Sequence, residues 1–134
     1  MALCIISAKQ FATKLKATIQ SSGRLGFTDE TAKSLDLSLG KYAKFAQDDE
    51  KGILYLVVLD SADEDAFPIR ESGGYFYVPT KQMFDMLGYN YEKNNIMFDL
   101  IRRQNLDEKL VGHAYQMKER INKRKERQND EVEQ

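Results

Sequence analysis

The chain has 134 residues and a formal net charge of −1, with 42% hydrophobic and 31% charged residues. This balance is typical of one soluble globular domain with a single core. No apolar run approaches the roughly eighteen residues of a membrane-spanning helix, and the single Cys4 excludes an internal disulfide. We therefore expect a cytoplasmic protein that does not contact a membrane.

The small net charge conceals an uneven distribution of charges along the chain. Residues 8–28 carry basic side chains and no acid, residues 48–65 are mainly acidic, and residues 118–127 are mainly basic. A polyanion would therefore contact one end of the molecule and not its whole surface.

In the first half, residues 8–16 fit the periodicity of a helix and of a strand, and this choice stays open. Extended structure is expected at 17–20, followed by a Ser-Gly turn. Thr28 and Asp29 are suitable N-cap residues for a short helix. The strands expected in this half, besides that at 17–20, lie at 24–28, 41–47 and 53–59. The last of these is almost wholly apolar and is the clearest strand in the chain.

The second half follows the same plan. Strands are expected at 67–71, 75–78 and 96–102, and a helix at 80–87. Pro79 suits the start of this helix and Gly88 its end, where Tyr89 would make the hydrophobic contact that accompanies a Schellman motif. Because 18–37 and 68–89 share a hairpin, a Ser-Gly turn and a short helix, we predict an internal repeat.

The tail has a different pattern. Apolar residues recur every three or four positions, and Asn105 with Glu108 is typical of a helix start. We therefore predict a C-terminal helix over 105–127, followed by disorder over 128–134. Its apolar stripe would lie on the domain or pair with a second copy, which makes a homo-oligomer possible. The stripe consists of Leu106, Leu110, Met117 and Ile121.

Together these patterns predict an α+β fold. Residues 1–104 would form a single domain of two pseudo-repeats, at about 15–60 and 65–102. Each unit would be a β-hairpin, a short helix and a strand, and the two units would build an antiparallel sheet core with the C-terminal helix added.

The first unit resembles the AbrB-type swapped-hairpin module of bacterial DNA-binding proteins, and the tandem copies are similar to the MraZ-like arrangement. The first copy carries this resemblance at Gly23, Arg24, Leu25, Phe27, Leu35, Leu37, Gly40 and Phe45. The second copy carries it at Gly74, Tyr75, Phe76, Val78, Pro79, Leu87, Gly88 and Ile96. The resemblance implies DNA contact through basic strands and turns. The second copy departs from it, because Gly74-Tyr75 stands where the first has Gly23-Arg24, and the acidic loops would repel phosphate if they lay nearby.

A second resemblance competes with the first. Residues 42–87 look like four strands and a helix, which is similar to the Whirly and transcription-coactivator fold that binds single-stranded DNA. That resemblance implies base stacking on Tyr75, Phe76 and Tyr77 beside Arg70.

From these patterns we expect a non-enzymatic DNA-associated protein, such as a bacterial transcriptional regulator, binding duplex or single-stranded DNA. The alternative is a protein-binding assembly or adaptor module that does not contact nucleic acid. No nucleophile–base pair, metal cluster or phosphate loop is present, so we expect no catalytic residue, metal or cofactor. The candidate nucleic-acid contacts are Lys14, Lys16, Arg24, Arg70, Tyr75, Tyr77, Lys123 and Arg124.

Overall fold

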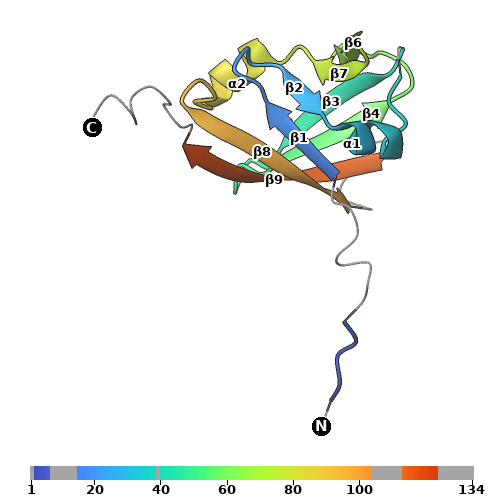
Figure 1. The fold of residues 1–134 in the computed structure, drawn as a ribbon, viewed down its shortest axis with the longest axis vertical. Coiled ribbons are helices and arrows are strands. Elements are labelled where there is room, and N and C mark those ends of the chain that lie inside the picture. Colours follow the sequence, from blue (N-terminus) through green and yellow to red (C-terminus); the bar gives the residue numbers. More distant parts are fainter. Residues whose placement is uncertain (1, 7–14, 39, 104–112, 124–134) are drawn as a thin grey trace.

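The computed structural model describes residues 2–6, 15–38, 40–103 and 113–123. Strand residues make up 47% and helical residues 13%, so the sheet is the architecture and the helices are additions to it. The predicted α+β class is therefore wrong. The chain forms a nearly closed antiparallel barrel of nine strands with two short helices (Figure 1).

The elements follow one another closely along the chain. In chain order they are β1 (Leu15–Ile19), β2 (Leu25–Phe27), α1 (Asp29–Ser34), β3 (Tyr42–Gln47), β4 (Leu54–Leu59), β5 (Phe67–Pro68), β6 (Arg70–Ser72), β7 (Tyr75–Val78), α2 (Lys81–Leu87), β8 (Asn94–Arg103) and β9 (His113–Lys123). Hairpin, short helix and hairpin thus occur in this order in each half of the chain.

The two halves share one sheet. Its strand order is β5-β3-β4-β9-β8-β1-β2-β7-β6. The pairs β1–β8, β2–β7 and β4–β9 each join a strand of one half to a strand of the other. A single core therefore lies inside the barrel, between strands that come from both halves.

One short segment closes the barrel. β5 and β6 are the two outermost strands of the sheet, yet only Ile69 separates them along the chain. β5 pairs with β3 and β6 pairs with β7. Between them the buried Ile69 donates its backbone N–H to the Lys41 carbonyl at 3.0 Å. The segment 67–72 therefore passes from one end of the sheet to the other.

Helix α1 begins at a side-chain cap, as the sequence predicts. The Thr28 hydroxyl accepts a hydrogen bond from the backbone N–H of Thr31, and Asp29 and Glu30 lie in the first turn, where negative charge is favourable. The fully buried Thr31 hydroxyl in turn accepts from the Lys16 backbone N–H at 2.8 Å. This bond holds α1 against β1.

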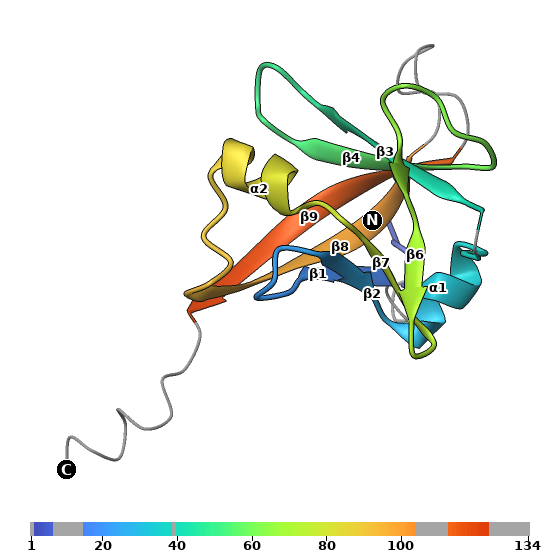
Figure 2. The ribbon, with the colours of Figure 1, turned by 90° about the horizontal axis from the view of Figure 1, so that it is seen from above.

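Helix α2 lies between the β3–β4 hairpin and the strands β8 and β9 (Figure 2). It ends at Gly88, whose φ of +85° is readily adopted by glycine, and the Tyr89 N–H bonds back to the Phe84 carbonyl at 3.0 Å. The Tyr89 ring meets the Phe84 ring edge to face, and Phe84 stacks on Phe98 of β8. The predicted helix end is confirmed, and it inserts an aromatic cluster into the core.

The predicted C-terminal helix is wrong over 113–123. These residues form β9, which pairs with β8 from Ala114 to Lys123 and with β4 from His113 to Met117. Met117 is buried at 3% exposure, so it cannot belong to an oligomer stripe on a helix, whereas Ile121 is 50% exposed. Leu106, Leu110 and the predicted disorder over 128–134 lie outside the described residues.

For residues 8–16 the sequence left helix and strand open. Leu15 and Lys16 belong to β1, so the last two of these positions are strand, and 8–14 are not among the described residues.

Within the described part of the chain, neither helix is long and apolar enough to cross a membrane.

Candidate nucleic-acid interface

The outer face of strands β6, β7, β2, β1, β8 and β9 gathers five of the predicted site residues. Directly paired residues of antiparallel strands lie on the same face, so the strand registers define one continuous row across these strands. In spatial order the row is Arg70, Tyr77, Gly26, Thr18, Met97 and Arg120. It begins and ends at an arginine.

A second row on the same face adds two lysines. Lys16 of β1 lies opposite Asp99 of β8, and Asp99 lies opposite Lys118 of β9. Asp99 accepts two hydrogen bonds from the Arg120 guanidinium, at 3.0 and 2.6 Å. It is the one acid that the described registers place on this face. Among the described residues, Lys16, Arg70 and Lys118 have no carboxylate within ion-pair distance.

Arg24 joins this face through an aromatic contact. Its guanidinium carbon lies 4.3 Å from the centre of the Tyr77 ring, and its Nε donates to the Ser22 hydroxyl at 3.3 Å. An arginine over an aromatic ring makes a cation–π contact and keeps its charge. The predicted pair Arg24 and Tyr77 is therefore brought together, although 53 positions of sequence numbering separate 24 from 77.

Tyr75 lies across the neighbouring strand and has a structural role. Its hydroxyl accepts a hydrogen bond from Gln20 Nε2 at 2.6 Å and lies directly above Gly26. A Cβ atom at position 26 would come within 1.7 Å of this hydroxyl oxygen. The absence of a side chain at Gly26 is thus what allows Tyr75 to reach Gln20.

We expect Gly26→Ala to displace Tyr75 and to lower the free energy of unfolding by about 1–3 kcal/mol, the usual effect of overpacking. Urea denaturation followed by circular dichroism measures this change. In a Tyr75→Ala background the same substitution should have a much smaller effect, because the clash is gone. An equal loss of stability in both backgrounds would contradict this explanation.

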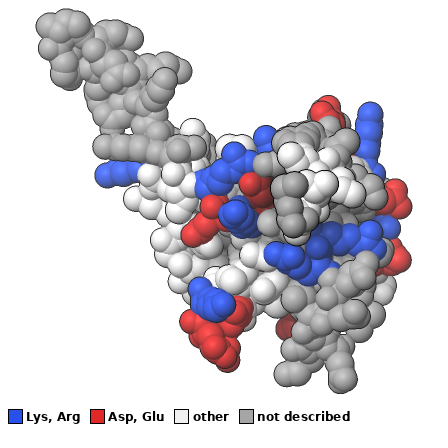
Figure 3. Space-filling model, turned by 90° about the horizontal axis from the view of Figure 1, so that it is seen from below, with Lys and Arg blue, Asp and Glu red and all other residues white. Residues whose placement is uncertain are grey.

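The acidic loops join β3, β4 and β5, which do not carry these rows. The loop before β4 lies beside Lys118, because Lys51 and Gly52 line one hollow with it. Lysines in β3 or next to it pair with the loop after β4: Lys41 contacts Asp60 at 2.6 Å, and Lys44 contacts Asp63 at 2.5 Å. The hydrogen bond from Lys44 also lowers the pKa of Asp63. Figure 3 shows a band of Lys and Arg side chains across the middle of the molecule, with smaller acidic spots beside it.

The remaining predicted contacts divide into two groups. Lys14 and Arg124 lie outside the described residues. Position 123 pairs with Asn94 and alternates with Arg120 along β9, which places it on the opposite face of the sheet.

Although the sequence shows that 118–127 is basic, the candidate contacts did not include three basic residues of the outer face. They are Arg103, whose Nε donates to Gln116 at 2.9 Å, together with Lys118 and Arg120. Lys118 and Arg120 are two positions apart, which puts them on one face of a strand but on different sides of a helix. The predicted tail helix concealed this signal.

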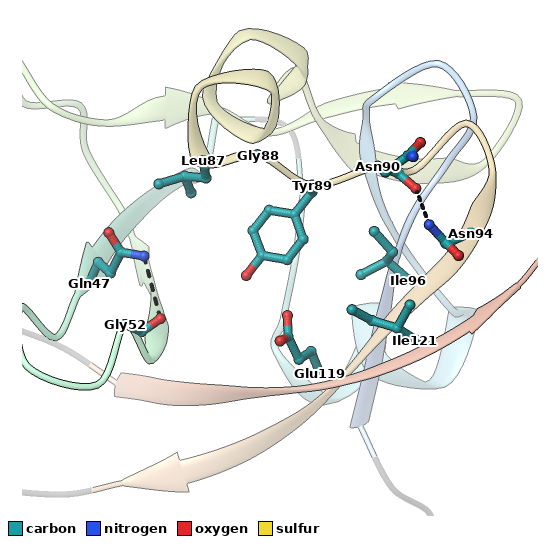
Figure 4. Close-up of a pocket in the computed structure, with 10 residues that line it drawn as sticks. All are labelled: Gln47, Gly52, Leu87, Gly88, Tyr89, Asn90, Asn94, Ile96, Glu119 and Ile121. Carbon is teal, nitrogen blue, oxygen red and sulfur yellow. Dashed lines mark hydrogen bonds between the residues drawn. The ribbon is translucent and has the colours of Figure 1, made fainter.

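A groove lies at the opposite surface of β9. Pairing of β4 with β9 ends at Leu54 and Met117, and beyond this point the two strands are separated by a hollow of about 440 Å³. Leu87, Tyr89, Ile96 and Ile121 line it (Figure 4). The Tyr89 side chain points towards Glu119 and partly fills the opening between the strands.

Burial, together with the charge of Glu119 and a hydrogen bond to it, raises the pKa of Tyr89 to about 12. The neutral phenol is therefore favoured in the folded protein, and its stabilising contribution is complete below the ordinary tyrosine pKa of about 10. This contribution is lost as the pH rises from about 10 through 12. Between about pH 10 and 12 we expect the free energy of unfolding to fall less for Tyr89→Phe than for the wild type. Urea denaturation at a series of pH values measures this difference. Parallel curves for the two proteins would show that Tyr89 does not titrate in this way.

Comparisons with protein-family models, with curated proteins and with solved structures found no match to the chain. The resemblances described above therefore stay predictions.

Proposed function

We propose that this protein binds single-stranded DNA, without catalysing a reaction, through the basic outer face of its barrel. The observation that supports this proposal most strongly is the row from Arg70 to Arg120, which has an arginine at each end and includes Tyr77, whose ring the Arg24 guanidinium contacts. Cations spaced along a surface neutralise successive phosphates, and aromatic rings and guanidinium planes stack on bases.

The shape of this face favours a single strand over a duplex. Readers of duplex sequence usually insert a helix or a two-stranded ribbon into the major groove. Here α2 has a fully buried Phe84 that fixes it to the core, and α1 is held to β1 by Thr31, so neither of these short helices projects as a reading helix. The outer face is a sheet surface, which a flexible strand can follow.

The dimensions of the face are consistent with a short site. Six neighbouring strands span about 24 Å at the usual spacing of about 4.8 Å. This width suits a segment of at least the roughly four nucleotides found in small single-strand sites.

A role in transcription goes beyond this geometry and rests on the resemblance of the hairpin units to bacterial regulators.

The proposal is tested by fluorescence anisotropy with the full chain and labelled 12-nucleotide DNA, in single-stranded and duplex form, at about 20 and 200 mM salt. We expect the single strand to bind more tightly than the duplex, and its binding to weaken steeply as salt is added. A single-stranded RNA of the same sequence shows whether the sugar matters. Absence of binding to single-stranded DNA at low salt with about 100 µM protein would overturn the proposal.

A further inference from the structure

Part of β9 has a partner on one side only. β8 pairs with β9 as far as Lys123, whereas β4 pairs with it only as far as Met117. Among the residues that the structure describes, no strand pairs with 118–123 on the β4 side. In a strand, every second residue turns its N–H and C=O groups towards the same edge, and an unpaired edge is a template for another strand.

The unpaired edge has an apolar centre. Ile121 is 50% exposed, although its direct partner on β8, Ile96, is buried. Both side chains line the hollow beside Leu87 and Tyr89. Ile121 interrupts the charged residues 118–120 and 123, which otherwise give this edge the protection by charge that exposed edges usually have.

We propose that two copies of this chain pair antiparallel through this edge of β9, centred on Ile121. In this register Ile121 lies opposite Ile121 of the second copy, and Arg120 lies opposite Asn122 of the second copy. Glu119 lies opposite Lys123 of the second copy, and symmetry provides this pair twice. Opposite charges directly across two strands stabilise the pairing, and like charges oppose it.

Other registers fit less well. Centring the pairing on Arg120 would place two arginines opposite each other and leave Glu119 opposite isoleucine. A parallel arrangement in register would place every charge opposite its own copy. The charged residues that flank Ile121 therefore select one arrangement.

The pairing also fits the length of β9 that β4 leaves unpaired. With Ile121 at the centre, the paired positions run from 119 to 123. Met117, where β4 begins to occupy the edge, lies outside this stretch. So short an interface falls below the roughly 1,000 Å² of stable complexes, and we expect a weak dimer with a dissociation constant on the order of 100 µM.

Sedimentation velocity of the full chain from about 10 to 500 µM tests the proposal. We expect the wild type to shift from monomer to dimer within this range, and Glu119→Lys or Lys123→Glu to weaken the dimer roughly tenfold, since each places two pairs of like charges across the interface. The double substitution Glu119→Lys with Lys123→Glu should restore the dimer, because the charges are then exchanged. Lys33→Glu on the exposed side of α1 is the matched control and should leave the dimer unchanged.

The rescue distinguishes this pairing from a local effect of Glu119 on Tyr89, which a change at position 123 would not repair. A wild type that stays monomeric throughout the range, or a double variant as weak as the single ones, would overturn the proposal. Assemblies larger than a dimer would also overturn it, because a two-fold strand pair closes on itself.

Discussion

We expect replacement of Lys16, Arg70 and Lys118 with alanine together to weaken the proposed binding to single-stranded DNA by roughly 100-fold at low salt. Each of these side chains lies on the outer face without a carboxylate partner in the described part of the chain, so its charge is available to a phosphate. A loss of about 1 kcal/mol for each contact gives this factor, since about 1.4 kcal/mol corresponds to tenfold in affinity.

The same variant should also depend less on salt. Each phosphate contact with a single strand contributes about 0.7 to the slope of log affinity against log salt concentration, so three lost contacts reduce the slope by about 2. Fluorescence anisotropy at several salt concentrations measures the slope and the affinity together. Circular dichroism confirms that the variant is folded.

A variant with a matched change of net charge provides the control. Lys33 and Lys93 are exposed lysines at α1 and before β8. Replacing Lys33 with glutamate and Lys93 with alanine changes the net charge by the same amount but leaves the outer face intact. We expect less than a threefold loss of affinity, because distant exposed charges are largely screened. Equal losses in both variants would show that net charge, and not this face, governs binding.

Phe84→Ala is expected to lower the free energy of unfolding by about 3–5 kcal/mol, the usual effect of removing a buried phenyl ring. Phe84 is fully buried, its ring lies 6.2 Å from that of Phe98, and it meets Tyr89 at 5.4 Å. It is the residue of α2 that anchors the helix to the core. A loss of this size is a large part of the roughly 5–15 kcal/mol that stabilises a typical domain.

Urea denaturation followed by circular dichroism measures this loss. Met86→Ala is the control, because Met86 lies two positions further along α2 and is 77% exposed. We expect it to change the free energy of unfolding by less than about 0.5 kcal/mol. A loss below 1 kcal/mol for Phe84→Ala would mean that α2 does not depend on this ring.

Local elements of the fold were predictable where short-range chemistry decides them. The apolar run at 53–59 predicts a strand, and β4 occupies Leu54–Leu59. Pro79 and Gly88 bracket a predicted helix, and α2 occupies Lys81–Leu87. Turn residues, caps and apolar runs act over a few positions, so they can be recognised without knowledge of distant contacts.

The tail shows where such reasoning fails. Met117 and Ile121 are four positions apart, which suits a helix, but with Tyr115 they also occupy alternate positions of a strand. Pairing with β8 (Asn94–Arg103) makes this segment a strand, because every residue of β8 has a partner on β9. A partner strand that is distant in sequence overrides a weak local periodicity, and no local pattern reveals it.

The candidate site was predictable in part for the same reason. Arg24, Arg70, Tyr75 and Tyr77 were identified from turns and strands that were correctly placed, and Lys16 from the basic N-terminal stretch, where helix or strand was left open. The structure brings all five to one face. The structural role of Tyr75 depends on Gly26, which only the register between β2 and β7 reveals.

The strand order of the barrel also determines how the chain can reach its folded state. Pairing of β1 with β8 and of β4 with β9 requires residues from opposite halves to meet, so few of the joining contacts can form early. Sheets dominated by such distant pairs fold in milliseconds to seconds, more slowly than helical bundles of similar size. The Phe67–Ser72 segment bonds to both ends of the sheet, so its pairing can be complete only after β3 and β7 have taken their places. A nascent chain that ends before β8 lacks one of the two partners of β1 and one of the two partners of β4, so we expect the sheet to be complete only when synthesis has passed β9.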